Sequence, residues 1–484
     1  MTPRHLCLII LATLLAAQVA AQATTGAKPA AEPPAAPAAK PRNPFEFKVA
    51  LSDDPEADEI KFRFFGQHRS RAELRTPAQY NAGLAAQEAR LAVNMRNRLG
   101  VDVLFPASAG LLFEVQDVRL FGDEPRAAAN SANTSGVDSF DVLQANVYSP
   151  NLLDVGIEAR LGRQKFTIGN QRLFSTLEWL AQSRAWDGLT LRRSFDGQYH
   201  LLGFALLINE LNRVQDDEWM LGLTFRWTPT FLKDNEFEVV LLNQHRDDAG
   251  GLNDAHFTTA SLRWNGRFAF SDALAMAFTA EGVAQFGTAD SAFWGTPGKD
   301  DANVQAFASA LTADLHWSLG DHSLRFGLEW EYASGDSDPT DNTFQTFRSP
   351  FPFGHRYNGF ADQVGWRNLH DFGASLEWKL KLDGWVETIS VFAQAHAFQR
   401  ENDDDAWYGV AGTVTRSGTP DHSDELGYEV DLVLALKITR WTAFEVGWAH
   451  FFAGRFVKQT AVGGGSAGED SDMDFAWAQF TLQF

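Results

Sequence analysis

The sequence predicts an all-β fold, a transmembrane antiparallel β-barrel of about 18 strands with short periplasmic turns and long extracellular loops. Two patterns carry this prediction. Apolar residues recur at every second position, and the connections between strand-like segments alternate between long and short. Composition agrees, because 13% of the residues are aromatic while the mean hydropathy is only −0.24. Such a chain spreads its apolar surface thinly, as a barrel wall with one lipid-facing side does.

Composition also excludes several classes of protein. The chain has 484 residues and a single cysteine, Cys7, which rules out a disulfide framework and a thiolate metal cage. Its 41 Lys+Arg against 62 Asp+Glu give a net charge of −21, the opposite of the basic footprint of a nucleic-acid-binding protein. After the N-terminal region, no apolar run approaches the roughly 18 residues that a membrane-spanning helix needs. We therefore expect no nucleic-acid partner and no helical membrane domain.

The N-terminus is typical of a secreted protein. Residues 1–23 have a short positive start, an apolar stretch over 6–17 and a small-residue cleavage site at 21–23, which together predict a signal peptide. Residues 24–50 are rich in Ala and Pro, and we expect them to form a disordered periplasmic segment. The remaining chain, 51–484, is then one barrel domain with its N-terminus in the periplasm.

Alternation over segments of about ten residues identifies the individual strands. In 371–382 the even positions carry Phe, Ala, Leu and Trp, whereas the odd positions carry Asp, Gly, Ser, Glu and Lys. Residues 324–332 and 428–438 alternate in the same way, with a period of two rather than the longer period of a helix. The predicted strands start near residues 60, 88, 110, 139, 153, 186, 198, 219, 236, 257, 273, 304, 322, 366, 386, 425, 441 and 473.

The connections predict the orientation of the barrel. The long ones are 76–87, 122–138, 169–185, 209–218, 246–256, 288–303, 335–365, 401–424 and 455–472. The short ones lie near 106–109, 149–151, 195–197, 229–235, 271–272, 319–321, 383–385 and Arg440. Outer-membrane barrels have short periplasmic turns and long external loops, and an even strand number leaves both ends of the barrel in the periplasm. The last strand ends in Phe484, which resembles the signal read by the barrel assembly machinery.

Arginine recurs on the polar side of several predicted strands. On the lipid-facing side each arginine would cost roughly 2–4 kcal/mol, so these side chains should face the lumen. They are Arg63, Arg69, Arg71, Arg75, Arg96, Arg98, Arg160, Arg163 and Arg325. Two interpretations remain open: the arginines pair with carboxylates to satisfy the interior, or they form an electropositive lane for an anionic solute. Because only Glu73 and Glu88 lie near those on the first two strands, part of that charge should stay free.

Chemistry other than transport has little support in the sequence. The barrel region contains no nucleophile elbow, HExxH zinc motif or phosphate-binding glycine loop, and His245 and His396 are isolated. We therefore expect no enzyme activity and no cofactor, and a barrel-embedded hydrolase is the least favoured function. One candidate metal site is the acidic turn of Asp336, Asp338 and Asp341. Its oxygen atoms suit Ca²⁺, although Asp is also common in ordinary turns.

Three stretches resemble the alginate-export family of outer-membrane barrels. They are LGRQKFTIGNQRL at 161–173 with its continuation to SRAWDG, the region 328–369 with EYASGDS and FPFGHRYNGFADQV, and the hairpin at 425–457. The family pattern in the first stretch corresponds to Arg163, Gln164, Arg172, Trp179 and Arg184. The resemblance therefore adds Arg172 and Arg184 to the arginines of the solute path. Near Gly162 the apolar parity flips, which predicts a bulge or a loop insertion.

The resemblance implies an outer-membrane channel that carries a polyuronate or related anionic polymer past luminal arginines. We therefore expect an exporter of an alginate-type acidic polysaccharide, and the alternative is a general or small-anion nutrient porin. An exporter needs loops such as 335–365 and 169–185 folded over or into the lumen. The expected partners are the anionic solute, outer-membrane lipid and the barrel assembly machinery, while periplasmic export components remain an open possibility.

Overall fold

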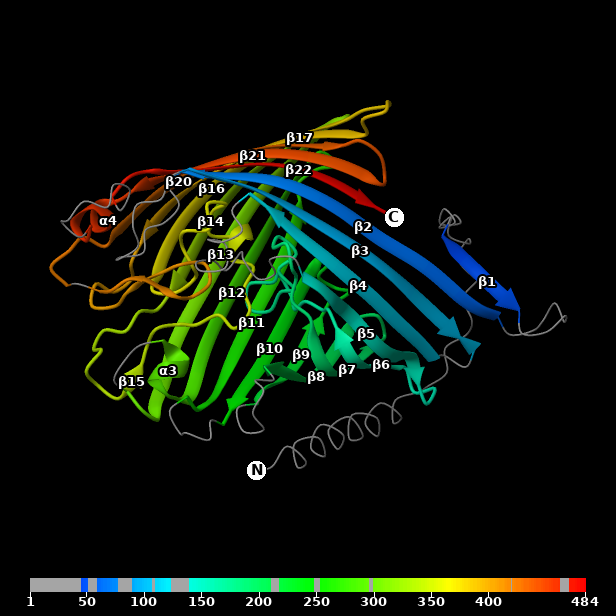
Figure 1. The fold of residues 1–484 in the computed structure, drawn as a ribbon, viewed down its shortest axis with the longest axis horizontal. Coiled ribbons are helices and arrows are strands. Elements are labelled where there is room, and N and C mark those ends of the chain that lie inside the picture. The colour runs from blue at the N-terminus through cyan, green and yellow to red at the C-terminus, as the bar shows by residue number, and fades with distance from the viewer. Residues whose placement is uncertain are drawn as a thin grey trace. The chain divides into compact units, whose positions relative to one another are not determined.

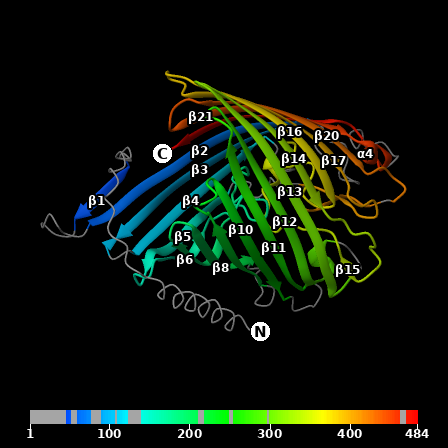
Figure 2. The same ribbon diagram turned by 180° about the vertical axis from the view of Figure 1, so that it is seen from behind.

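In the computed structural model, eighteen strands close into one antiparallel barrel (Figure 1, and from behind in Figure 2). The structure describes residues 45–50, 59–76, 89–106, 109–122, 139–209, 217–247, 253–295, 299–418, 420–461 and 470–484. The barrel strands are β2 (Glu59–Thr76), β3 (Arg90–Phe105), β4 (Ala109–Phe121), β5 (Ser139–Leu152), β6 (Ile157–Gln164), β7 (Trp186–Phe195), β8 (Tyr199–Asn209), β9 (Glu218–Trp227), β10 (Asn235–Arg246), β11 (Ala255–Ala269), β12 (Leu274–Ala289), β13 (Ala302–Leu319), β14 (His322–Ala333), β16 (Leu369–Lys381), β17 (Thr388–Gln399), β20 (Glu425–Lys437), β21 (Thr442–Ala453) and β22 (Met473–Gln483). Neighbours in this order pair, and β22 pairs with β2 to close the ring.

The strands place polar side chains inside the ring and apolar ones outside. On β16, Phe372 and Leu376 are 50% and 52% exposed on the outer face, whereas Asp371 is fully buried inside. On β14, Phe326 and Leu328 lie on the outer face in the same way. Alternation has this result because successive side chains of a strand point to opposite sides of the sheet. The outer face is therefore the apolar band that meets lipid in a transmembrane barrel.

The predicted barrel is confirmed, and each predicted strand starts within four residues of its observed position. Long and short connections alternate as expected, so the barrel has a long-loop end and a short-turn end. One predicted turn, 149–151, is wrong, because β5 continues through it to Leu152. The chain reverses instead at Leu153 and Asp154, which have φ angles of 52° and 56°. The Gly156 amide closes this turn by donating to Asn151 Oδ1 over 2.6 Å.

The N-terminal predictions fall mostly outside the described residues. The predicted signal peptide, 1–23, lies entirely outside them, and so does most of the predicted disordered segment, 24–50. The last residues of that segment form β1 (Glu46–Ala50), which pairs with β2. The chain divides into the units Met1–Glu46 and Phe47–Phe484, and the barrel belongs to the second unit. Among the described residues, no helix has both the length and the apolarity to cross a membrane.

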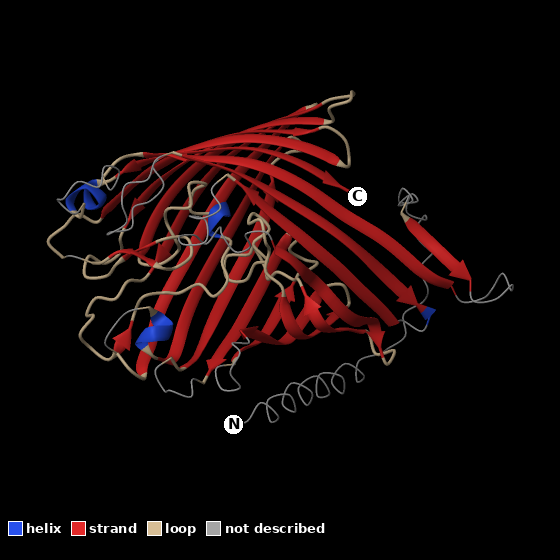
Figure 3. Cartoon of the chain, viewed as in Figure 1, coloured by secondary structure: helices blue, strands red, loops and turns tan. Residues whose placement is uncertain are grey.

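Two long connections run inside the ring of strands (Figure 3). The first inner loop, residues 165–185, joins β6 to β7. The second inner loop, residues 334–368, joins β14 to β16 and contains β15 (Thr343–Phe344) and η3 (Gly354–Arg356). The two loops meet at a β-bridge between Phe174 and Phe351. The other long connections carry α3 (Ser291–Trp294), β18 (Trp407–Tyr408), β19 (Val414–Arg416) and α4 (Arg455–Gln459).

Aromatic side chains of the first inner loop build a core inside the barrel. The Phe174 ring is fully buried, 5.0 Å from that of Phe166 and 4.3 Å from that of Trp186. Each large apolar side chain buried in this way contributes about 1.5–3 kcal/mol. The parity flip near Gly162 is therefore a loop insertion: β6 ends at Gln164 and the chain continues into the interior. Gly162 has a φ angle of 118°, where a Cβ would lie 2.5 Å from the Ala145 carbonyl oxygen.

Candidate functional site

Four of the predicted arginines form a cluster on the inner wall. This basic sector comprises Arg69 and Arg71 of β2 and Arg96 and Arg98 of β3, all 2–7% exposed. Strand register explains the cluster, because Arg69 lies directly opposite Arg96 across the β2–β3 pair. Alternation then places Arg71 and Arg98 on the same inner face. The predicted crowding of charge in one part of the wall is therefore present.

The basic sector binds the first inner loop mainly through backbone carbonyl groups. Arg69 donates to the carbonyl oxygens of Glu178 and Leu180 over 2.8 and 2.7 Å. Arg96 donates to the same two oxygens, and Arg71 donates to the Trp179 carbonyl over 2.8 Å. These arginines therefore hold residues 178–180 against the β2–β3 wall.

The charges in this region do not balance. Among the residues that the structure describes, the four guanidinium groups of the basic sector make ion pairs with two carboxylates, those of Glu73 and Glu178. Their other acceptors include backbone carbonyls and the Gln67 and Gln116 amides, which are neutral. Burial alone would raise the pKa of the Glu178 carboxyl, but the neighbouring cations, Arg98 first, lower it to about 2. Glu178 is therefore ionised at neutral pH and still leaves a positive excess.

The second inner loop lies against a wall of opposite charge. We call it the acidic sector: Glu329 and Glu331 of β14, Asp371 of β16, and Glu429 and Asp431 of β20. All but Glu329 are fully buried. The Ala361 amide donates to Glu429 Oε1 over 2.7 Å, and the Asn358 side chain donates to Glu331 Oε2 over 2.7 Å. The acidic sector therefore binds N–H groups of the loop.

Arg172 and Arg184, which the resemblance added to the path, lie on the first inner loop itself. Arg172 forms ion pairs with both Glu329 and Glu331 and stacks 3.7 Å over the Tyr357 ring. Arg184 donates to the Pro352 carbonyl over 3.2 Å, and burial lowers the pKa of this guanidinium to about 10. Both residues thus fasten the two inner loops to each other or to the wall.

The two inner loops also touch directly beside the basic sector. The centroids of the Trp179 and His355 rings are stacked 3.7 Å apart, and the guanidinium carbon of Arg71 lies 3.8 Å from the centroid of the Trp179 ring. Arg75 of β2 donates to the Ala361 carbonyl over 2.8 Å and so bonds the second loop. The loops, the basic sector and the acidic sector therefore form one contact network across the lumen.

The remaining predicted arginines lie elsewhere on the wall. Arg63 pairs with Asp102, and Arg325 pairs with Asp314 at 2.6 Å and Glu377 at 3.4 Å. Arg160 faces inward and donates to Asn146 Oδ1 over 2.8 Å.

Arg163 departs from the expectation that it lines the lumen. It is opposite in parity to the buried Gln164 and shares the outer face with Leu161, which is 57% exposed. There it pairs with Asp187 at 2.9 Å and Asp141 at 3.5 Å. Arg163 and Gln164 of the family motif are the last two residues of β6. Because they are adjacent on a strand, their side chains point to opposite sides of the wall.

Two cavities lie on the short-turn side of the inner loops. One, of about 580 Å³, is lined by the loop residues Arg172 and Tyr357 and by Arg325, Glu329 and Glu377 of the wall. The other, of about 460 Å³, lies beside residues 165–169 and is lined by Arg192, His200, Arg226 and Glu238. Both combine cationic and carboxylate groups with open space inside the barrel.

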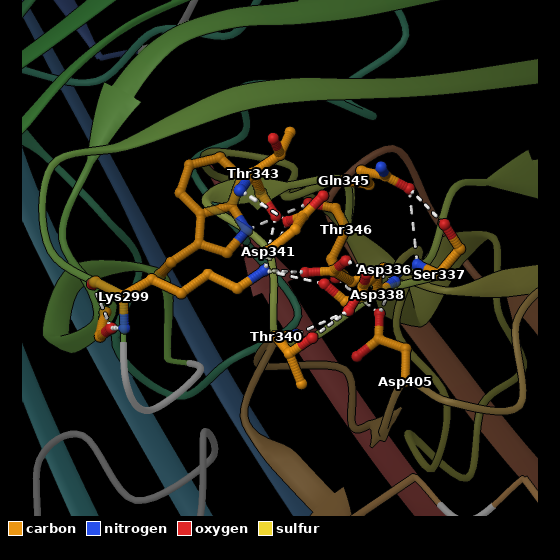
Figure 4. A network of polar contacts seen from close by, with 12 residues as sticks. Lys299, Asp336, Ser337, Asp338, Thr340, Asp341, Thr343, Gln345, Thr346 and Asp405 are labelled. Carbon is orange, nitrogen blue, oxygen red and sulfur yellow. Dashed lines mark hydrogen bonds and ion pairs between the residues drawn. The ribbon is translucent and has the colours of Figure 1, made fainter.

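The candidate calcium turn contains a lysine ammonium group instead (Figure 4). Lys299 Nζ lies 2.9 Å from Asp336 Oδ2 and 3.3 Å from Asp341 Oδ1, and it donates to the Thr343 carbonyl over 2.6 Å. Burial raises the pKa of the Asp336 carboxyl, and the Lys299 ammonium opposes that rise. This arrangement disfavours Ca²⁺, because the lysine already supplies the positive charge.

Several residues of the site had no distinctive signal in the sequence. Glu178 and Lys299 are single charged residues in long loops, and their partners are 80 and 37 positions away. Glu429 lies on the polar side of a predicted strand, so its inward direction was predictable but its bond to the second loop was not. His396, isolated in sequence, lies 2.9 Å from Asp371 across the β16–β17 pair.

Comparisons with known proteins give one family and a set of similar folds. A family model described as alginate export matches residues 61–470. Acinetobacter baumannii OccAB1 superposes with a TM-score of 0.54 at 10% identity, over 90% of this chain and 98% of that one. Pseudomonas aeruginosa OprD gives 0.51 at 10%, over 87% and 93%. Pseudomonas aeruginosa OccK2, solved in complex with glucuronate, gives 0.50 at 11%, over 87% and 96%. No curated protein matches the chain.

Proposed function

We propose that this chain, which belongs to the alginate-export family, is an outer-membrane channel that passes an acidic saccharide through a lumen narrowed by its two inner loops. The family and the fold support an outer-membrane channel. The solute, the direction of transport and the absence of catalysis are the proposed parts. Our preferred solute is an alginate-type acidic polysaccharide leaving the cell.

The observation that carries this proposal is the positive excess of the basic sector, which lies against the first inner loop. Charged rings at a constriction select ions of the opposite sign, and buried arginine keeps its charge where lysine loses it. Because the four arginines of the basic sector pair with two carboxylates, the β2–β3 side of the narrowed lumen favours an anion. The solute path runs past the basic sector, Arg75 and Arg172, and on to Arg63, Arg160, Arg184 and Arg325. Arg163 is left out, because it faces outward.

A uronic acid fits this environment chemically. Its carboxylate is planar and accepts two parallel N–H bonds from a guanidinium group, while its hydroxyls bond neutral amides and carboxylates. OccK2 was solved with glucuronate, a single uronic acid. An alginate-type polymer presents the same group at every ring, so a chain of arginines along the wall suits its repeated charge.

A nutrient porin for small anions is the second candidate, and the cavities favour it. Their volumes of about 580 and 460 Å³ fall within the range of small-molecule sites, about 300–1,000 Å³. Each has room for a small sugar acid together with water. A porin of this type would take up monomers and would not conduct the polymer.

Current block in planar bilayers separates the two candidates. Purified full-length protein would be reconstituted and exposed to glucuronate, to alginate oligomers of increasing length, and to neutral oligosaccharides of matched length. An exporter is expected to be blocked at lower concentrations as the charged oligomer lengthens. A small-anion porin is expected to respond to glucuronate and to ignore long oligomers. Equal block by charged and neutral oligomers would overturn both.

The proposal also covers the side of the outer membrane on which the N-terminus lies and the way the barrel is inserted. We propose cleavage after the signal peptide, a periplasmic N-terminus, and insertion by the barrel assembly machinery through the strand that ends in Phe484. Periplasmic export components remain an additional partner class. An epitope tag placed within 24–50 should resist protease added to intact cells and be cleaved once the outer membrane is opened. Cleavage of the tag on intact cells would contradict this orientation.

A further inference from the structure

Two histidines form a pair on the outside of the barrel, away from the solute path. His245 lies near the end of β10 and His256 near the start of β11, and strand register places them directly opposite each other. Their neighbours Gln244 and Phe257 are 4% and 2% exposed and point inward, so the two imidazoles point outward. They are isolated in the sequence but adjacent at the long-loop end of the wall.

A carboxylate touches both rings. The Nε2 atom of His245 lies 3.1 Å from Asp247 Oδ2, and the Nε2 atom of His256 lies 3.3 Å from Asp247 Oδ1. On the other side of the rings, the two Nδ1 atoms are 2.8 Å apart. The three side chains thus form a compact group whose potential ligand atoms all lie within 4.8 Å of one another.

The shared carboxylate fixes the hydrogen positions on the two rings. An ionised carboxylate only accepts hydrogen bonds, so the Nε2 atom of His245, which bonds Asp247 Oδ2, carries hydrogen, and the Nε2 atom of His256 carries hydrogen when it pairs with Asp247 Oδ1. In neutral imidazoles this leaves a lone pair on each Nδ1 atom, and two lone pairs only 2.8 Å apart repel. A positive species between them removes the repulsion, and the choice is between a proton and a metal ion.

We propose that His245 and His256 bind a divalent transition-metal ion of tetragonal preference, Cu²⁺ above all, through their two Nδ1 atoms. Metal–imidazole bonds of about 2.0 Å to two nitrogens 2.8 Å apart subtend an angle of about 90° at the ion. That angle belongs to tetragonal Cu²⁺ or Ni²⁺ coordination, whereas Zn²⁺ prefers a tetrahedral site. The order of affinities for divalent ions also puts Cu²⁺ first.

Asp247 acts in this site as a positioning residue. Metal-bound histidines commonly donate their second N–H to a carboxylate, which fixes the tautomer and raises the basicity of the ligand nitrogen. Here one carboxylate serves both rings. The metal would cross-link β10 to β11 at the long-loop end on the outer face, and the lumen would be unaffected.

The site can be tested with the full chain in detergent by titrating Cu²⁺ against a competing chelator and recording electron paramagnetic resonance spectra. We expect one ion per chain with an axial spectrum and nitrogen hyperfine structure. His245→Gln and His256→Gln should each weaken binding at least about 100-fold, and Asp247→Asn by about 10- to 100-fold. The matched control is His450→Gln, because His450 also contacts two aspartates but has no histidine opposite it. This control should bind Cu²⁺ like the wild type.

Several results would overturn the proposal. It fails if the His245→Gln/His256→Gln double variant binds Cu²⁺ as tightly as the wild type, or if Zn²⁺ binds as tightly as Cu²⁺. It also fails if Asp247→Asn leaves the affinity unchanged, because the tautomer argument then has no basis. Heat-modifiable gel migration of each variant shows that the barrel is folded, and these exposed positions leave the interior untouched. Channel conductance should be the same with and without Cu²⁺, which separates this site from the proposed solute path.

Discussion

The two sectors bind different backbone groups of the inner loops: the basic sector binds carbonyl oxygens of the first loop, and the acidic sector binds an N–H group of the second. Arginines of β2 and β3 donate to carbonyl oxygens at residues 178–180, whereas Glu429 on β20 accepts from the Ala361 amide. The difference matters for charge. A carbonyl group satisfies a guanidinium group without neutralising it, and a backbone amide likewise leaves the charge of Glu429 in place, but the acidic sector also has side-chain partners that carry, or on protonation gain, a positive charge. Arg172 pairs with Glu329 and Glu331, and the His396 ring lies beside Asp371.

This contrast assigns different roles to the two walls. The acidic sector fixes the position of the second inner loop, and Arg172 pairs with two of its five carboxylates. The basic sector fixes the first inner loop and also keeps a positive excess that an anion can use. We therefore expect changes in the basic sector to alter both the conductance and the ion selectivity of the channel. Changes in the acidic sector should alter the conductance alone.

The largest effect is expected from the triple variant Arg69→Ala/Arg71→Ala/Arg96→Ala. It removes the three arginines that donate to the backbone carbonyls of residues 178–180 and leaves Arg98 with its bond to the Glu178 side chain. The first inner loop should then move away from the wall, and single-channel conductance should rise at least about twofold. The positive charge of these arginines accounts for a change in selectivity, and their bonds to the loop add the change in conductance. Single-channel recording measures it. The control Arg119→Ala, an arginine on the outer face of β4, should leave conductance unchanged.

A smaller effect is expected from Glu429→Ala in the acidic sector. The Ala361 amide would lose its acceptor inside the barrel, at a cost of about 1–3 kcal/mol. The second inner loop should then be cut faster by trypsin after Arg356, with anion preference retained. Glu429→Gln, which keeps an acceptor oxygen, is the matched control and should resemble the wild type. A loss of anion preference in Glu429→Ala would contradict the different roles assigned to the two sectors.

Acidification should loosen the basic sector through Glu178. The pKa of this carboxyl is lowered from 4.5 to about 2 in the folded protein, so its stabilising contribution is complete above pH 4.5. It is lost as the pH falls toward 2, because the carboxyl then becomes protonated and releases Arg98 and Arg96. Conductance should therefore rise modestly across that window. In Glu178→Gln the same titration should be flat, and an unchanged pH response in that variant would exclude Glu178 as its source.

The smallest effect on conductance is expected from Lys299→Met, which touches neither sector. Removing the ammonium leaves Asp336 buried without its cation, so the thermal unfolding midpoint should fall. Conductance should stay the same. Ca²⁺ should now partly restore the midpoint in the variant but have no effect on the wild type, because the aspartate oxygens become free for a cation. A stabilising effect of Ca²⁺ on the wild type would revive the calcium interpretation of this turn.

Much of the wall could be predicted from the sequence, whereas the interior could not. Alternation in segments such as 371–382 fixed strand positions and the inward direction of Arg69 and Arg96, because the pleat permits only two directions. The parity flip at Gly162 even indicated the first inner loop. Which atoms the arginines meet was not predictable, because a backbone carbonyl carries no side-chain signal and Arg69 bonds residues 109 and 111 positions away. The contact between His245 and His256 likewise depends on register across a loop.

In the proposed function, the basic sector makes the narrowed lumen anion-selective. The most direct test is the reversal potential of the wild-type channel in a planar bilayer with a KCl concentration gradient, measured beside the triple arginine variant. We predict that the wild-type potential has the sign of chloride preference and moves toward zero in the variant. A cation-selective wild type, or a variant that retains the full chloride preference, would contradict the claim.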